Sequence, residues 1–328
     1  MSDRGILDLA IARLKGFSFG EKTILCDAIE SEEDLARLSG RDLTALVGRS
    51  PRSARAEIEK ARALAEKDER AARLRGIKWT GWRDATYPPL LREIYDPPTA
   101  LFFMGSLPDC EKPLVAIVGT RKPSAQAATQ AFDIARGLAR SGVSVVSGLA
   151  LGIDAMAHRG CMEGGAPTYA ALGSGIDCIY PASNRHVARR ALDTGGGIIS
   201  EYPPGFPARK WTFPARNRII SGLCRGVLIA EAPEKSGALI TARFALDQNR
   251  DLWVASEGVA SSGGGAEDAR FDRTGCRRLA QDGADIVYSA SDILRMWGME
   301  PDERSGGGLE LGPGAAVSSL ADSLGIAL

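Results

Sequence analysis

Short apolar runs that alternate with helix-forming stretches from residue 113 onward restrict the possible folds of this chain more than any other feature. A short, continuous apolar run is typical of a strand buried on both faces. Strands that alternate with helices form a parallel sheet with helices on both sides. The sequence therefore predicts an α/β fold with a Rossmann-like parallel sheet covered on both faces. The expected strands are 115–118, 143–146, 168–172, 198–200, 227–230 and 252–255, with a last strand and helix within 285–297.

The chain divides into four regions by composition. Residues 1–75 have leucines at helical spacing and Gly turns, which predict a small helical N-terminal domain; it could be a plain scaffold, or a hairpin that offers backbone amides to phosphate. Residues 76–112 form a Pro- and aromatic-rich connector. Residues 113–297 are expected to form the Rossmann-like domain. Residues 298–328 are expected to be a poorly ordered tail, and the Gly-rich stretch 261–272 a mobile loop.

Overall charge, cysteine content and hydropathy argue against a uniformly basic protein, a disulfide-rich or metal-binding protein, and a membrane protein. Lys plus Arg equals Asp plus Glu at 41 each, so attraction to phosphate has to come from local clustering. The six cysteines are scattered without a CxxC pair, so we expect no disulfide framework and no metal site. No targeting segment or membrane-spanning run is present, which favours a cytoplasmic protein with no membrane contact.

Glycine or serine follows nearly every expected strand. Parallel strands share one carboxyl edge, which is where such sheets bind ligands. Glycine lets backbone amides approach a phosphate, although tight turns without a ligand need glycine too. No GxGxxG follows the first strand and no GxxxxGK[ST] occurs, which disfavours a dinucleotide cofactor and a P-loop, so no cofactor is expected. The candidate residues are Gly119, Thr120, Arg121, Lys122, Ser147, Gly148, Gly173, Ser174, Ser236 and Gly237.

The stretch 202–230 contains no Asp or Glu and mixes basic with aromatic side chains. Single-stranded nucleic acid needs cations for its backbone and rings on which its bases stack. A solvated basic loop with core aromatics is the alternative. The candidate DNA-binding residues here are Lys210, Phe213, Arg216, Asn217 and Arg218, of which the last three could instead serve nearby acids and the fold.

Two acids, Glu201 and Glu231, are expected at the same edge. They could perform acid/base chemistry, as in a nucleotide N-glycosidic hydrolase, or they could orient arginines. Unpaired acids would repel phosphate, so a DNA site requires them to be bound to arginines. Asp154 and His158 lie one helical turn apart, but no nucleophile accompanies them, and a packing histidine is the simpler interpretation. No catalytic residue is therefore assigned.

The motifs VAIVGTRKPS, SGLALGIDAMAHRG, ALGSGIDCIYP, ISEYPPG, FPARNRIISGL and EAPEKSGALITA closely resemble those of the DprA/Smf family of DNA-processing proteins. The resemblance implies a single-stranded DNA-binding homodimer that protects incoming DNA and loads the RecA recombinase during natural transformation. It places Arg121, Lys210 and Phe213 in the DNA pocket and implies no catalytic activity. It also implies a sterile-alpha-motif-like N-terminal domain, which this N-terminus matches only loosely.

The chain departs from the family pattern in several places. Val254–Gly258 stands where Val-Pro-Gly is usual, a Gly-rich insertion follows, and Arg277 stands where Asn is usual. The winged-helix domain of many members is expected to be missing. Related hydrolases carry a PGGxGT-type motif where this chain has EAPEKSGALIT, which disfavours the enzyme alternative.

Overall fold

The structure is a computed structural model that describes residues 5–49, 54–260 and 271–301. Most of the predicted mobile loop and nearly all of the predicted tail lie outside these residues. In the described part, a nine-stranded sheet has the order β1-β2-β6-β5-β4-β3-β7-β8-β9. The strands are β1 (Lys78–Gly81), β2 (Ala100–Gly105), β3 (Leu114–Val118), β4 (Ser144–Ser147), β5 (Thr168–Leu172), β6 (Gly197–Ser200), β7 (Gly226–Ile229), β8 (Asp251–Ala255) and β9 (Asp285–Val287).

The sheet from β6 to β9 is parallel, as predicted, and helices connect its strands. The segment predicted as a connector does more than connect, because it contributes β1 and β2. These two strands pair antiparallel with each other, and β2 pairs antiparallel with β6. Prolines flank the two strands and do not interrupt them, so the Pro-rich composition concealed them.

Alternate side chains of each strand face opposite layers of helices. Val115 and Ile117 of β3 pack in the core beneath α7, α8 and α14, whereas Ala116 and Val118 pack beneath α10 and α11. The helices of this region are α6 (Pro89–Arg92), α7 (Ala125–Arg140), α8 (Ile153–Glu163), α9 (Arg185–Asp193), α10 (Thr212–Gly222), α11 (Gly237–Asp247), α12 (Ser256–Val259), α13 (Thr274–Gln281) and α14 (Ala290–Met296), with a 3₁₀ turn at Ala182–Asn184.

Helix α10 begins earlier than the sequence indicated. The sequence alone indicates a helix near 216–223. Pro214 instead lies in the first turn of α10, where the amide has no helical partner to lose. As a result, Phe213 belongs to the helix and has a fixed direction.

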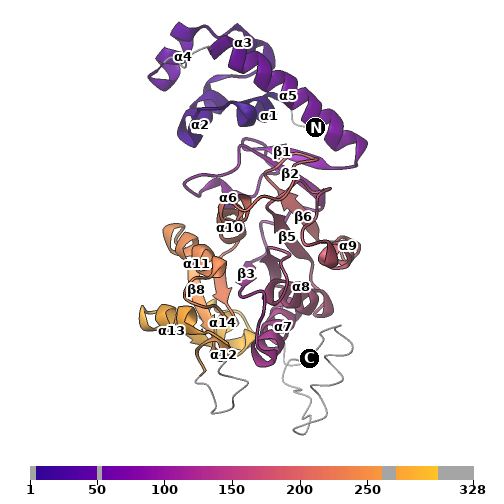
Figure 1. The fold of residues 1–328 in the computed structure, drawn as a ribbon, viewed down its shortest axis with the longest axis vertical. Helices are drawn as coiled ribbons and strands as arrows, with labels where there is room; N and C mark the ends of the chain where they lie inside the picture. The colour runs from indigo at the N-terminus through magenta and orange to yellow at the C-terminus, as the bar shows by residue number, and fades with distance from the viewer. Residues whose placement is uncertain (1–4, 50–53, 261–270, 302–328) are drawn as a thin grey trace.

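Figure 1 shows the N-terminal helices at one end of the molecule, beyond β1 and β2. One continuous hydrophobic cluster runs from Leu7 and Leu25 through Phe102 to Val187 and Ile198, so the helices share a core with the sheet. Ser18 and Ser39 begin two of the helices with capping boxes. No described helix is long and apolar enough to cross a membrane. These helices are α1 (Leu7–Arg13), α2 (Phe19–Ala28), α3 (Glu32–Arg37), α4 (Gly40–Val47) and α5 (Ala54–Leu74).

Candidate nucleic-acid interface

The loop after β3 is held from below and directs Arg121 outward. The Thr120 N–H donates to the Glu231 carbonyl at 2.7 Å, and the Thr120 carbonyl accepts from Ile153 N–H at 3.2 Å. A Cβ at Gly119 would lie 2.6 Å from Ile153 Cγ1, so only glycine fits there. The backbone is thus fixed, while the Arg121 and Lys122 side chains remain exposed.

Arg121 lies over the ring of Phe213, which belongs to α10. Its guanidinium carbon lies 5.7 Å from the Phe213 ring centroid, a cation–π distance. The ring of Tyr180 lies 5.6 Å from that of Phe213, tilted by 46°. We call Arg121, Tyr180 and Phe213 the edge cluster. Tyr180 is 52% exposed, and the sequence analysis missed it. An aromatic residue just after the Gly-rich loop of the third parallel strand was the available signal.

The other aromatic residues of the 202–230 stretch form a separate group. Tyr202 stacks on Phe206 at 4.7 Å, and Trp211 meets both rings edge-on. Arg209 lies over Phe206 at 5.9 Å. Tyr202 is buried and Trp211 is 59% exposed, so the group joins the core to the surface. Lys210 is exposed and lies within this group along the chain, between Arg209 and Trp211.

Arg216, a predicted DNA contact, is buried and fastens two strand ends. Its Nη1 donates to the Gly148 carbonyl at 2.9 Å and to the Ala171 carbonyl. Burial lowers the pKa of Arg216 to about 10, although the nearby Asp154 opposes this shift. Asp154 in turn accepts from Gly148 N–H at 3.0 Å and Ala150 N–H at 3.2 Å. Arg216 thereby holds the loops after β4 and β5 beneath the edge cluster.

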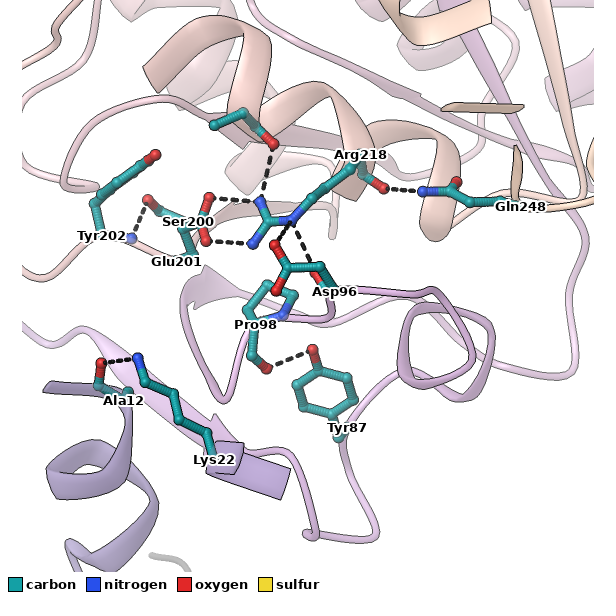
Figure 2. Close-up of polar contacts among 11 residues, drawn as sticks. Ala12, Lys22, Tyr87, Asp96, Pro98, Ser200, Glu201, Tyr202, Arg218 and Gln248 are labelled. Atoms are coloured by element: carbon teal, nitrogen blue, oxygen red, sulfur yellow. Dashed lines mark hydrogen bonds and ion pairs between the residues drawn. The ribbon is translucent and has the colours of Figure 1, made fainter. Parts of the chain in front are cut away.

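Figure 2 shows Arg218 held between Glu201 and Asp96. Its two terminal nitrogens donate to the Glu201 carboxylate at 2.8 and 2.6 Å, and Nε donates to the Asp96 carbonyl at 2.8 Å. Burial lowers the pKa of Arg218, but the hydrogen bonds and charge of Glu201 outweigh it and raise the pKa above its usual value. Asn217 donates to the Gly237 carbonyl at 3.1 Å. Both side chains are thus committed to the fold.

Glu231 is bound just as firmly. Its carboxylate accepts from Ser124 N–H at 2.7 Å, from Ser124 Oγ at 3.0 Å and from Arg273 Nε at 2.9 Å. The expectation that both acids are bound to arginines is confirmed. Arg273 was not anticipated, because it follows a Gly-rich stretch far from Glu231 in the sequence.

The remaining predicted residues serve the backbone of the edge. Ser147 Oγ donates to the Ile117 carbonyl and Ser174 Oγ to the Cys178 carbonyl, both at 2.7 Å. Ser236 caps α11 by accepting from Ala238 N–H, and Gly237 begins that helix at the surface. Gly173 lies against Phe213, where a Cβ would be 3.2 Å from the ring.

His158 is a packing residue and not half of a dyad. Its Nδ1 lies 2.7 Å from Thr168 Oγ1, and it is fully buried. Burial and the charge of Arg216 lower its pKa from 6.5 to about 3. Among the described residues, no group of three or more His, Cys, Asp or Glu side chains is placed to hold a metal ion.

Comparisons of sequence and of structure with known proteins agree with one another. The family model described as DNA recombination-mediator protein A matches residues 78–298. A protein Smf from Synechocystis is 42% identical over 222 residues, which cover 66% of this chain and 53% of the relative. The aligned region thus spans about half the length of that relative.

Two solved structures are similar. The X-ray structure of DNA processing protein A from Streptococcus pneumoniae has a TM-score of 0.69 and 32% identity, covering 88% of this chain and 97% of that one. A Helicobacter pylori DNA processing protein A, solved to describe its single-stranded DNA binding mode, has a TM-score of 0.55 and 28% identity, covering 67% and 95%.

Proposed function

Because this chain belongs to the DNA recombination-mediator protein A family, we propose that it binds single-stranded DNA at the edge cluster and the exposed Lys122 and Lys210. The observation that supports this most directly is the Arg121 guanidinium lying over Phe213, with the exposed Tyr180 ring beside it. Exposed rings can stack on unpaired bases, and the cations can neutralise the phosphates between them.

The ion pairs of the two acids support the proposal. Glu201 and Glu231 are each satisfied by an arginine, so neither presents a free carboxylate to a phosphate. The same pairing argues against a nucleotide N-glycosidic hydrolase. Glu231 is 1% exposed, and an acid/base catalyst has to reach its substrate.

The cellular role is proposed from the relatives. As a recombination mediator, the chain would protect incoming single-stranded DNA as a homodimer and load the RecA recombinase onto it. Acceleration of RecA filament growth on protein-coated single strands would test the loading step, and sedimentation would test the dimer.

Fluorescence anisotropy with labelled single strands and duplexes over a range of salt concentrations tests the DNA proposal. Arg121→Ala and Lys210→Ala should each weaken single-strand binding and make its salt dependence shallower by roughly 0.7 in slope per phosphate contact. Arg278→Ala, an exposed arginine on α13, is the matched control and should bind as the wild type does. Wild-type affinity in both site variants, or base release from nucleotides that Glu231→Gln abolishes, would contradict the proposal.

A further inference from the structure

Helix α9 begins with a positive charge, which its own dipole does not favour. Arg185 is the first residue of the helix, His186 is the second, and the first turn contains no acid. Helix N-termini favour negative groups, because unpaired backbone N–H groups point outward there. An anion outside the protein would compensate this arrangement.

The exposed side chains of α9 form two rows of basic residues. Arg185 and Arg189 lie one helical turn apart, as do His186 and Arg190, and the buried Val187, Ala188 and Ala191 occupy the opposite face of the helix. Like charges at this spacing repel. Arg189 reaches Asp193 only at 4.0 Å, with both groups exposed, so this pair compensates little of the charge.

Helix α8 adds Arg159 to the second row. His186 Nδ1 lies 2.7 Å from the Ser183 carbonyl, which can only accept, so Nδ1 carries the proton. His186 Nε2 is then an acceptor for Arg159 Nη2 at 3.2 Å. The histidine thus orients the Arg159 guanidinium, and the positive charge of Arg190 lies close enough to act on Arg159. We call Arg159, Arg185, Arg189 and Arg190 the α9 face.

The α9 face is tied to the edge cluster by the chain between them. Asn184, which precedes α9, donates to the Leu149 and Ala150 carbonyls at 3.0 and 2.9 Å and so anchors the helix start to the loop after β4. Tyr180, at the start of the same connection, contacts Phe213. Figure 1 shows α9 flanking the sheet beside β5 and β6, next to α8.

An apolar hollow lies beside the first row. It has a volume of about 280 Å³ and is lined by Ile176, Ile179, Leu192 and Ile198, with Arg185, Arg189 and Asp193 as the charged residues of its walls. Ile179 directly precedes Tyr180, so the chain joins one wall of the hollow to the edge cluster. A flat apolar group flanked by phosphates would match these walls, and an unstacked nucleobase is such a group.

We propose that the α9 face binds the phosphates of the single strand beyond the nucleotides held at the edge cluster. This rests on the function proposed above and assigns the path that the strand follows across the protein. Continuity with the edge cluster and the apolar hollow favour DNA over an acidic protein, which would need neither.

Binding of a short and a long oligonucleotide tests the path separately from the site. The triple variant Arg185→Gln, Arg189→Gln, Arg190→Gln is compared in the full chain with a control that removes three exposed cations of α5: Lys60→Gln, Lys67→Gln, Arg70→Gln. The probes are oligo-dT of about 6 and about 25 nucleotides, since sites on single strands cover roughly 4–16 nucleotides. Circular dichroism confirms that both variants are folded.

The α9 variant should bind the long probe at least about tenfold more weakly and lose about two units of salt slope, because three phosphate contacts at roughly 0.7 each are removed. It should bind the short probe as the wild type does, and the control should keep wild-type affinity for both. Equal losses in the two variants, or unchanged long-probe binding, would overturn the path. Failure of the wild type to bind the short probe would overturn the edge cluster instead. A partner protein that loses binding to the α9 variant while long-probe binding is unchanged would assign the face to that protein.

Discussion

Arg273 Nε donates to Glu231 Oε1 at 2.9 Å, with both side chains almost completely buried. Strand β3 lies between β4 and β7, and at such a change of direction doubly wound sheets leave a crevice that binds ligands. Here Glu231 follows β7, and its carboxylate binds Ser124 at the start of α7. The ion pair therefore fastens the loop that presents Arg121.

Breaking this pair should be costly. Arg273→Ala leaves the Glu231 carboxylate buried without its cation, so we expect the free energy of unfolding to fall by about 3 kcal/mol or more. Urea denaturation measures the change. Arg278→Ala changes an exposed arginine of α13, the helix that begins directly after Arg273, and should change this free energy by no more than about 0.5 kcal/mol. A cost for Arg273→Ala as small as that of the control would refute the structural role of the pair.

Arg216 and Arg121 should separate stability from binding. Lysine at 216 has a single nitrogen, so it cannot donate both to the Gly148 and Ala171 carbonyls, as Nη1 does, and to Asn217 Oδ1, as Nε does. Arg216→Lys should therefore destabilise the fold by about 2 kcal/mol. Where it is folded, its DNA affinity should keep the wild-type salt slope. Arg121→Gln should instead keep stability and lose slope. Thermal unfolding and anisotropy measure the two effects, and a reduced slope in Arg216→Lys would return that residue to the DNA contacts.

Replacing two of the predicted site glycines by alanine should change the free energy of unfolding in opposite directions. A Cβ at Gly148 would lie 2.7 Å from both Arg216 Nη2 and Asp154 Oδ2, which are locked by other contacts, so Gly148→Ala should cost about 1–3 kcal/mol. Nothing lies within 4 Å of a Cβ at Gly237, the first residue of α11, so Gly237→Ala should be neutral or stabilising by up to about 1 kcal/mol. Denaturant midpoints of the two variants decide this, and similar values would contradict the described packing.

His158 should make stability depend on pH. Its pKa is lowered from 6.5 to about 3 in the folded chain, so below about pH 6.5 the unfolded chain binds a proton that the folded chain excludes. The free energy of unfolding is highest above pH 6.5, where the histidine is neutral in both states. As the pH falls from 6.5 towards 3, this free energy decreases by up to about 1.4 kcal/mol per pH unit.

Urea denaturation between about pH 7 and pH 5 measures this dependence above the range in which ordinary carboxylates titrate. His158→Asn should flatten the curve relative to the wild type, whereas the exposed His186→Asn, which replaces the other histidine of the chain, should not. A curve of unchanged slope in His158→Asn would exclude the histidine as its source.

The parallel strands and their Gly-rich ends were predictable, because burial on both faces leaves an unmistakable apolar run and sharp turns need glycine. The pairing of Glu201 and Glu231 with arginines was one of the alternatives that the sequence left open, and it was expected on the condition that this edge binds phosphate. The sequence did not predict which arginines would form these pairs. Arg273 approaches Glu231 only through the tertiary fold, and nothing in the local sequence marks it.

The burial of two arginines is the main difference between the expectation from the sequence and the structure. Arg216 and Arg218 occur in a basic stretch that is typical of a solvated surface, yet α10 turns both inward. Tyr180 shows the opposite case, since an aromatic residue next to proline suggests packing and here it is exposed. Side-chain direction depends on where a helix begins, and Pro214 made that start hard to place.

The hydrophobic cluster that joins Leu7 to Ile198 makes the N-terminal helices and the sheet one cooperative unit. Any ligand that stabilises the sheet edge should therefore also slow proteolytic cleavage within α1–α5, although the ligand does not touch them. The far end of the molecule can in this way report on whether the edge is occupied.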